Sequence, residues 1–409
     1  MPRLTPPAPR SELLLRPKEV FGPDGVLSGV VVLVLPDGTI GHVGPEAGLP
    51  PAGDDRVTVD APGSVLLPGL IDLHYLLLHA HSLHHRVSPT AGVLEAADTL
   101  ERLVRAGVTG LRDTSSDGTV MLDLRQLVRD GSLAGPDLFV SGSPIGAGGR
   151  GGAVYGSTEV DGPYEARKCA RRAIRTRIDF LSVAVTNGVA GGGIAGPGWL
   201  ELRDDEIEAA VAEARAAGRP VSANAIGVDG ISAAIRAGVD TIEHATMLTP
   251  EQADLMAERG IAMVPTLTIM HTFAERPDEV GLPPHLLDRV RRLLDAGYAA
   301  VEHALRAGVT IGAGTDSHGH ETVVDEIGHL ADAGLSVSQA VGAATAVAGG
   351  LLGPDARRGR LEPGQVADLL LVRGPVDALP RTLRTPELVI RNGRPVRAGD
   401  AVLKESLIP

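Results

Sequence analysis

Apolar and polar residues alternate along this chain in a pattern that predicts parallel strands separated by helices. The most apolar run, VLLPGLIDLHYLLLHAH at 65–81, is typical of a buried parallel strand and places His74 at the strand end. Helix-like segments separate it from seven further strand-like runs; one such segment, DDEIEAAVAEARAAG at 204–218, has Gly218 as its stop signal. The seven runs are VTGLRD (108–113), DLFVSG (137–142), DFLSVAV (179–185), PVSANA (220–225), TIEHA (241–245), MVPTLT (263–268) and TIGAGTD (310–316). Eight such units predict an α/β fold built on a (β/α)8 TIM barrel, in which chemistry takes place where the strands end.

Both ends of the chain have a different pattern, that of short strands joined by tight turns. The first part contains a predicted hairpin, GVVVLVLPDGTIGHVG at 29–44, and the tail contains GQVADLLLVRG at 364–374 and ELVIRNGRPV at 387–396. Neither end alone has enough strands to cover both faces of a sheet, so we expect one small β-sandwich made from both ends. The expected domains are 1–64 with 362–409 for the sandwich, and 65–361 for the barrel.

The composition argues against several classes of partner. The 409 residues include 38 Lys and Arg against 51 Asp and Glu, a net charge of −13, and no basic patch stands out, which argues against a nucleic-acid or anionic-membrane surface. The single cysteine, Cys169, cannot form an internal disulfide, which is typical of a reducing compartment. No run reaches about 20 apolar residues and no signal-peptide pattern is found, so we expect a cytoplasmic protein without a membrane segment. A small molecule is the expected partner, and formation of a homo-oligomer stays open.

Two long glycine-rich segments, 141–157 and 187–198, follow the third and fourth predicted strands. Neither contains GxxxxGKS/T, nor a GxGxxG that opens a helix, so they do not indicate a phosphate-binding loop. At the active face of a barrel they would be either flexible connections or lids that exclude water.

Five sequence motifs lie in or beside the predicted strands. They are LPGLIDLH in the first strand, AIRAGVDTIEHAT around the sixth, VPTLT in the seventh, IGAGTD in the eighth and LEPGQVADLLLV at the return to the terminal strands. Together they resemble the amidohydrolase superfamily, particularly its imidazolonepropionase-like and dipeptidase-like branch, over nearly the whole chain. The resemblance implies two divalent ions held by His-x-His on strand one, a carboxylated lysine on strand four, histidines on strands five and six, and an aspartate on strand eight. It identifies His74, His244 and Asp316 as counterparts of three of these ligands.

Other positions depart from that ligand set. Leu76 stands where the second histidine of strand one is expected, and its isobutyl group has no lone pair to give. Ser182 replaces the lysine of strand four, Asn224 and Ile226 replace the two histidines of a His-Ala-His on strand five, and Arg150 stands in place of a His-Gly signature after strand three.

The surviving residues leave three hypotheses for the function. By the resemblance, His74 and Asp316 would face one ion and His244 the other, so neither ion keeps the three protein ligands usual for catalytic zinc. We expect an enzyme without a metal cofactor that uses acid/base catalysis on a small molecule, in a cyclisation, elimination, isomerisation or activated-bond hydrolysis. Asp316 is then the candidate base, and His244 and His74 donate a proton or stabilise an oxyanion. The alternatives are a hydrolase of C–N bonds with one Zn²⁺ held by His74, His244 and Asp316, and a catalytically silent binding or scaffold protein.

Further polar residues lie near the predicted strand ends. Those that we expect to bind substrate are Ser182, Asn224, Arg150, Tyr75, Tyr155, His271 and His318. The loop after strand one also contains His79, His81, His84 and His85. This loop offers either a substitute metal site or a substrate-facing histidine cluster, and His318 with His320 leaves the same two possibilities.

Overall fold

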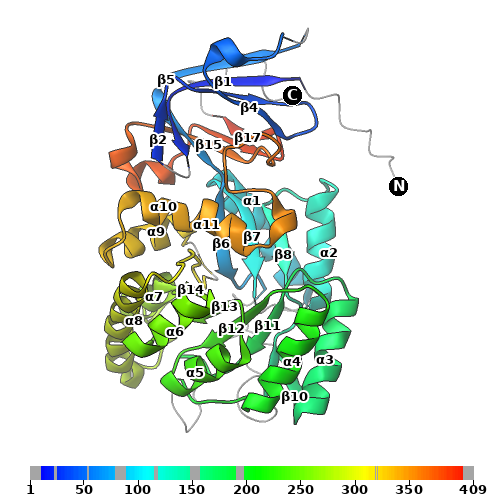
Figure 1. Ribbon diagram of the computed structural model, residues 1–409, viewed down its shortest axis with the longest axis vertical. Coiled ribbons are helices and arrows are strands. Elements are labelled where there is room, and N and C mark those ends of the chain that lie inside the picture. Colours follow the sequence, from blue (N-terminus) through cyan, green and yellow to red (C-terminus); the bar gives the residue numbers. More distant parts are fainter. Residues whose placement is uncertain are drawn as a thin grey trace.

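The computed structural model of the chain has a mixed β-sheet at one end of its long axis and a larger α/β part below it (Figure 1). It describes residues 11–22, 25–52, 55–78, 89–114, 118–147, 157–189, 198–317, 319 and 321–398. Among the helices in these ranges, none is long and apolar enough to cross a membrane.

Strands from both ends of the chain form the sheet at the top of Figure 1. Its order is β17-β16-β15-β5-β1-β3-β4, with β2 paired to β1, and β1 and β5 run parallel. The bounds are β1 (Leu13–Gly22), β2 (Gly25–Ser28), β3 (Val31–Val34), β4 (Ile40–Gly44), β5 (Val57–Pro68), β15 (Leu369–Arg373), β16 (Leu388–Arg391) and β17 (Arg394–Ala398). The association of the two ends was predicted. The described strands nevertheless make one sheet, so the two facing sheets of the predicted sandwich are not seen among them.

Alternate residues of β5 face opposite sides of this sheet. Val65 and Leu67 join the main hydrophobic cluster of the α/β part, whereas Leu66 between them belongs to a separate cluster on the other face. Both faces of the sheet are therefore buried at this point, which explains why the sequence of β5 is continuously apolar here. Gly69 lies between β5 and β6. Only glycine fits there, because a Cβ would lie 2.2 Å from the Thr109 hydroxyl oxygen.

The α/β part contains two parallel sheets, β6-β7-β8 and β10-β9-β11-β12-β13-β14. Backbone hydrogen bonds connect them on both sides. The amide of Asp179 donates to the carbonyl of Val140 (2.8 Å), and the 310–317 segment lies between β14 and β6, where the amide of Met263 donates to Thr310 (2.9 Å) and that of Leu73 to Ala313 (2.9 Å). The bounds are β6 (Leu70–Tyr75), β7 (Val108–Asp113), β8 (Asp137–Val140), β9 (Ile145–Ala147), β10 (Thr158–Val160), β11 (Leu181–Ala184), β12 (Val221–Ala225), β13 (Thr241–His244) and β14 (Ala262–Val264).

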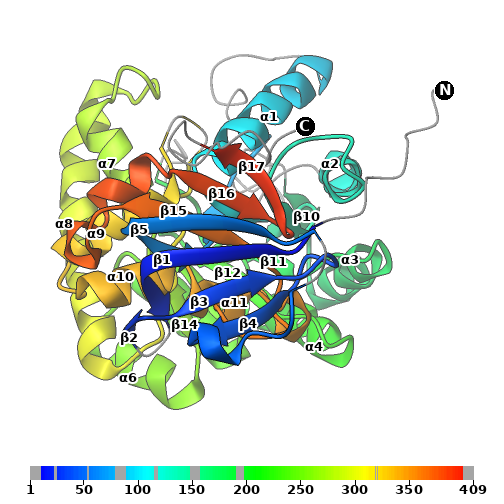
Figure 2. The ribbon, with the colours of Figure 1, turned by 90° about the horizontal axis from the view of Figure 1, so that it is seen from above.

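Helices lie around the outside of these strands (Figure 2). They are α1 (Pro89–Arg105), α2 (Gly118–Arg129), α3 (Pro163–Arg175), α4 (Asp204–Ala216), α5 (Val228–Ala237), α6 (Pro250–Arg259), α7 (Leu267–Glu275), α8 (Leu287–Ala307), α9 (Val323–Asp332), α10 (Val337–Ala343) and α11 (Ala346–Leu351). The predicted stop at Gly218 is confirmed, since α4 ends two residues before it and Gly218 has a φ of 64°.

The predicted strand MVPTLT differs from the structure. In the structure β14 ends at Val264, and α7 begins at Leu267 after Thr266, whose φ is 53°. The carboxylate of Glu326 in α9 accepts hydrogen bonds from the amides of Leu267 (3.0 Å) and Thr268 (2.8 Å). It thus satisfies two of the amides that the start of a helix leaves without partners. This partner lies about 60 residues away, so local β-propensity predicts the wrong element here.

A buried ionic cluster ties the terminal sheet to β8. Arg358 donates to Asp137 at the start of β8 (2.7 Å) and to Asp368 beside β15 (2.7 Å). Asp137 also pairs with Arg391 in β16. The cluster fixes the two parts of the molecule to each other.

Candidate active site at the strand ends

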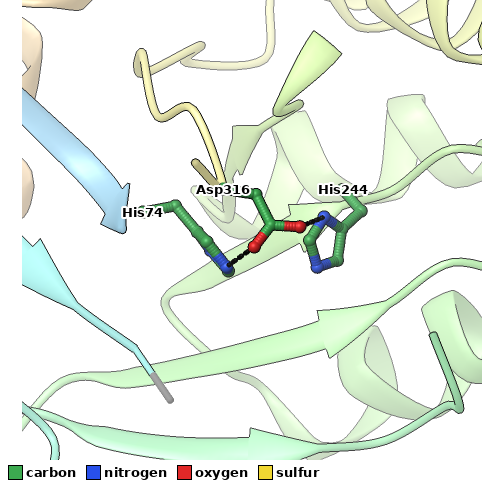
Figure 3. A group of neighbouring side chains, drawn as sticks. All are labelled: His74, His244 and Asp316. Atoms are coloured by element: carbon green, nitrogen blue, oxygen red, sulfur yellow. Dashed lines mark ion pairs between the residues drawn. The ribbon is translucent and has the colours of Figure 1, made fainter. Parts of the chain in front are cut away.

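His74, His244 and Asp316 come together at the ends of β6, β13 and the 310–317 segment (Figure 3). The His74 Nε2 atom lies 3.4 Å from Asp316 Oδ1, and His244 Nδ1 lies 4.0 Å from Asp316 Oδ2. The two imidazole centroids are 4.9 Å apart. The carboxylate therefore lies between the two rings. The three residues that the sequence predicted to carry the chemistry are neighbours.

His244 and Asp316 have unusual backbone conformations, which set the directions of their side chains. His244 and Asp316 have φ values of 67° and 53°, in the left-handed region that costs a residue with a Cβ about 1–3 kcal/mol. Glu243 and His244 are consecutive, and in a regular strand they would point to opposite faces. The left-handed turn at His244 brings both side chains to the same interior. Such strain persists only where the surrounding contacts impose it, and it gathers at functional sites.

Asp72 locks the strand of His74 to the segment of Asp316. Its carboxylate accepts hydrogen bonds from the amide of His74 (3.0 Å) and from the amide and hydroxyl of Thr315 (3.1 and 2.7 Å). Gly314 permits this close approach, because a Cβ there would lie 2.7 Å from the amide nitrogen of His74.

His74 is buried and held on both ring nitrogens. Its Nδ1 lies 2.9 Å from Glu243 Oε2, and its Nε2 lies 3.0 Å from the hydroxyl of Thr114 as well as facing Asp316. Burial by itself would lower the pKa of His74, but the Asp316 and Glu243 carboxylates outweigh it and raise that pKa to about 9.

His244 has the opposite electrostatics. Its Nδ1 is bonded to the Thr266 hydroxyl (2.7 Å), and burial lowers the pKa of its ring to about 4, which leaves it neutral at pH 7. About 15% of the His244 side chain and 17% of the Asp316 side chain are exposed, against 1% for His74. A substrate thus meets Asp316 and His244, with His74 behind them.

Ser182 and Asn224 lie side by side on β11 and β12. The Asn224 amide donates to the Ser182 hydroxyl (3.2 Å), and β12 pairs with β13 so that Asn224 is opposite Glu243. Ser182 is fully buried, whereas Asn224 is partly exposed. Of this pair, Asn224 is the better placed to meet a substrate.

Two residues that were predicted to bind substrate, Tyr75 and His271, do not point toward His74, His244 and Asp316 in this structure. Tyr75 follows His74 in β6 and faces the opposite side, where it is 1% exposed in the main hydrophobic cluster and burial raises its pKa to about 12. His271 lies in α7, where it stacks on His329 of α9 at 3.9 Å and bonds to Tyr298 of α8 (2.9 Å). Its Nδ1 lies 2.8 Å from Glu275 Oε1 within α7, so both ring nitrogens have partners outside the site.

The other predicted residues lie outside the part of the chain that the structure describes. These are Arg150, Tyr155 and His318 among the substrate-binding candidates, and His79, His81, His84, His85 and His320 among the loop histidines.

Glu243, Thr114 and Thr266 were missed from the sequence. Each contacts one of the two imidazoles directly. A signal for Glu243 was present, since a carboxylate inside the apolar run TIEHA needs a buried partner.

The three converging residues fit one divalent ion. One ligand atom from each of His74, His244 and Asp316 lies within 4.8 Å of the other two, and no other such group of three is found among the described residues. Three protein ligands with a fourth position open to water or substrate is the usual composition of a catalytic zinc site. The bond from His74 Nδ1 to a buried carboxylate is also the usual support of a metal-bound histidine. The resemblance had divided these residues between two ions, whereas here they face one point.

Among the described residues, the positions at which the resemblance places further ligands hold other side chains. Leu76 is buried where strand one would supply a histidine, Ile226 is buried after β12, and the Ser182 hydroxyl is bonded to Asn224. The geometry therefore suits at most one ion in the described part of the site.

Comparisons with known proteins bear on the family and the fold of this chain. The model of the amidohydrolase family matches residues 65–396. An uncharacterized protein of Mycobacterium tuberculosis is 32% identical over 361 residues, which cover 84% of this chain and 88% of that protein. Ochratoxinase of Aspergillus niger is 29% identical over 371 residues, covering 83% of this chain and 76% of its own. The crystal structure of a Xaa-Pro dipeptidase with methionine in its active site has a TM-score of 0.85 and 26% identity, covering 94% of this chain and 99% of its own. The resemblance found from the sequence motifs is confirmed.

Proposed function

Because the chain belongs to the amidohydrolase family, we propose that it is an enzyme that hydrolyses a C–N bond of a small molecule at the carboxyl ends of a (β/α)8 barrel. In this proposal His74, His244 and Asp316 hold a single divalent ion, Zn²⁺ by preference. One observation carries it: the Asp316 carboxylate lies between two imidazoles, with one ligand atom of each residue within 4.8 Å of the others. The names of two similar proteins, ochratoxinase and a Xaa-Pro dipeptidase, support a hydrolytic reaction.

The proposed roles of the site residues differ with their exposure to solvent. When bound, the ion would lower the pKa of a water molecule to about 7 and so make hydroxide available. His74 is the buried ligand, whose orientation is fixed from behind by Glu243. His244 and Asp316 are the ligands on the substrate side, and Asp316 is also the residue that accepts a proton at a carboxylate oxygen. Asn224, which is bonded to Ser182, donates to or accepts from the substrate at the position that the second ion leaves open.

A second function is favoured by the missing ligands. If Leu76, Ser182 and Ile226 mark the loss of the metal altogether, the same three residues perform acid/base catalysis unaided. Asp316 is then the base, His74 donates a proton and the neutral His244 stabilises an oxyanion, in a cyclisation, elimination, isomerisation or activated-bond hydrolysis. Such acid/base catalysis accelerates a reaction by about 10²- to 10⁴-fold.

Metal analysis of protein made in zinc-supplemented medium separates the two functions. We expect one Zn²⁺ per chain in the wild type, and a clear loss of that ion in His74→Ala and Asp316→Asn. His285→Ala removes an exposed histidine outside the site and is the matched control that keeps the ion. Wild-type protein that is free of metal, yet turns over substrate and loses turnover in Asp316→Asn, would establish the second function instead.

A panel of dipeptides and N-acyl amino acids then tests hydrolysis. Under the proposed function, turnover of at least one compound disappears in Asp316→Asn, while the melting temperature stays within a few degrees of the wild type. A metal-loaded protein without turnover on any amide, ester or cyclic substrate would point to a binding or scaffold protein.

A further inference from the structure

We propose that Glu243, held by Arg112, is a positioning residue that decides which ring nitrogen of His74 carries the proton and which faces the ion. The proposal rests on the single-ion function of this site and goes beyond it, since it assigns a role to two buried residues on β13 and β7.

The two carboxylate oxygens of Glu243 have separate partners. Oε2 lies 2.9 Å from His74 Nδ1, and Oε1 accepts a hydrogen bond from Arg112 Nη2 at 2.6 Å. Arg112 also donates through Nε to the carbonyl of Leu73, the residue before His74 (2.5 Å). The guanidinium thus holds the backbone beside His74 and the carboxylate behind its ring at the same time.

Two hydroxyl groups complete the surroundings of Glu243. Ser222 donates to Oε1 at 2.8 Å, and Thr241 donates to the same atom at 2.6 Å. Glu243 is 0% exposed and Arg112 is 3% exposed. Because Arg112, Ser222 and Thr241 all donate to Oε1, the Glu243 side chain has little freedom to turn away from His74.

The chemistry of these partners fixes the protonation of the ring. An ionised carboxylate is only an acceptor, so it requires a proton on His74 Nδ1. In a neutral ring the lone pair is then on Nε2, which is the atom that faces Asp316. Since a metal binds only the nitrogen that carries a lone pair, this arrangement prepares His74 as a ligand before the ion arrives.

Glu243→Gln tests this directly, because Gln keeps the size of the side chain and removes the charge. Arg112 can only donate, so the Gln oxygen must face Arg112 and its NH₂ group must face His74. We expect Nδ1 to become the acceptor and the proton to move to Nε2, the nitrogen that the ion needs. In ¹⁵N spectra of histidine-labelled protein without metal, recorded well above pH 9 so that the His74 ring is neutral and with His74→Ala used for assignment, the tautomer signature of His74 should invert. The affinity for Zn²⁺, measured with Zn²⁺ alone by competition with a chelating indicator, should fall about 10- to 100-fold.

A second carboxylate serves as the matched control. Glu206 in α4 accepts hydrogen bonds from the amides of Gly162 (2.6 Å) and Arg203 (2.7 Å) in the outer layer of the molecule. Glu206→Gln should lower the stability without changing the His74 tautomer or the Zn²⁺ affinity. This control separates a loss of stability from a loss of positioning.

The outcomes are distinct from those of the proposed function. A Glu243→Gln protein that keeps the wild-type tautomer and a Zn²⁺ affinity within about twofold overturns this inference. If the wild type binds no Zn²⁺, the single-ion function fails, and the tautomer measurement alone decides the role of Glu243. If Glu243→Gln does not fold, Glu243→Asp is used, since it keeps the charge but withdraws it from His74 Nδ1. An unchanged tautomer and unchanged Zn²⁺ affinity in Glu243→Asp would overturn the inference as well.

Discussion

Glu326 should make the stability of this protein depend on pH near neutrality. Its carboxyl group in α9 is fully buried and accepts from the amides of Leu267 and Thr268 and from the Thr268 hydroxyl (2.7 Å), which fixes the start of α7. Burial raises the pKa of Glu326 from 4.5 to about 7, although these hydrogen bonds partly oppose the shift.

The sign of the effect follows from this raised pKa. The folded protein binds the proton of Glu326 more tightly than the unfolded chain does, so protonation stabilises the fold. This contribution is complete below the unfolded pKa of 4.5 and is lost as the pH rises through about 7. A gap of about 2.5 pH units, at about 1.4 kcal/mol per unit, corresponds to about 3 kcal/mol in total.

Glu326→Gln isolates this contribution, because Gln resembles the protonated acid at every pH. The free energy of unfolding, measured with urea at pH 5 and pH 8 for both proteins, gives a difference between wild type and variant at each pH. We expect this difference to shift by about 2.5 kcal/mol in favour of the variant between pH 5 and pH 8. Asp72, whose pKa burial raises to about 6, titrates in both proteins and so largely cancels in the difference. Parallel stability curves for the two proteins over this range would refute the reasoning.

Three further substitutions test other parts of the structure. In Gly314→Ala the new Cβ would lie 2.7 Å from the His74 amide nitrogen, so the strand must move and the Zn²⁺ affinity should fall about tenfold or more; an unchanged affinity would show that the two strands can separate freely. Thr266→Val removes the hydrogen bond to His244 Nδ1 (2.7 Å), and we expect about a tenfold loss of Zn²⁺ affinity with a stability change below about 1.5 kcal/mol, whereas a large loss of stability with unchanged affinity would assign Thr266 to the fold alone. Arg358→Met removes the ion-pair partner of the buried Asp368 and leaves Asp137 with Arg391 alone, and it should cost about 3–5 kcal/mol in urea unfolding at pH 7; a cost below about 1 kcal/mol would mean that water replaces the guanidinium.

The sequence predicted most of the strands because their signals are local. The apolar runs that end at His74 and His244 became β6 and β13, and Gly218 ended its helix as expected. Local signals failed at MVPTLT, where Glu326 from a distant helix provides the acceptor that lets α7 begin early. Alternation along β6 places Tyr75, the neighbour of His74, on the opposite face, where it belongs to the main hydrophobic cluster.

The sequence by itself determined which side chains stand at the strand ends, and the resemblance carried by its motifs predicted three of them to be counterparts of metal ligands. Only the tertiary structure decided that Asp316 lies between the two imidazoles and that Glu243 supports His74 from 169 residues away. The physical reason is the difference in range. Alternation along a strand is fixed by the local backbone, whereas the contacts of a side chain across the interior depend on how the strands are staggered. The left-handed backbone conformations of His244 and Asp316 depend on the packing around them, and no pattern of residue types predicts either one.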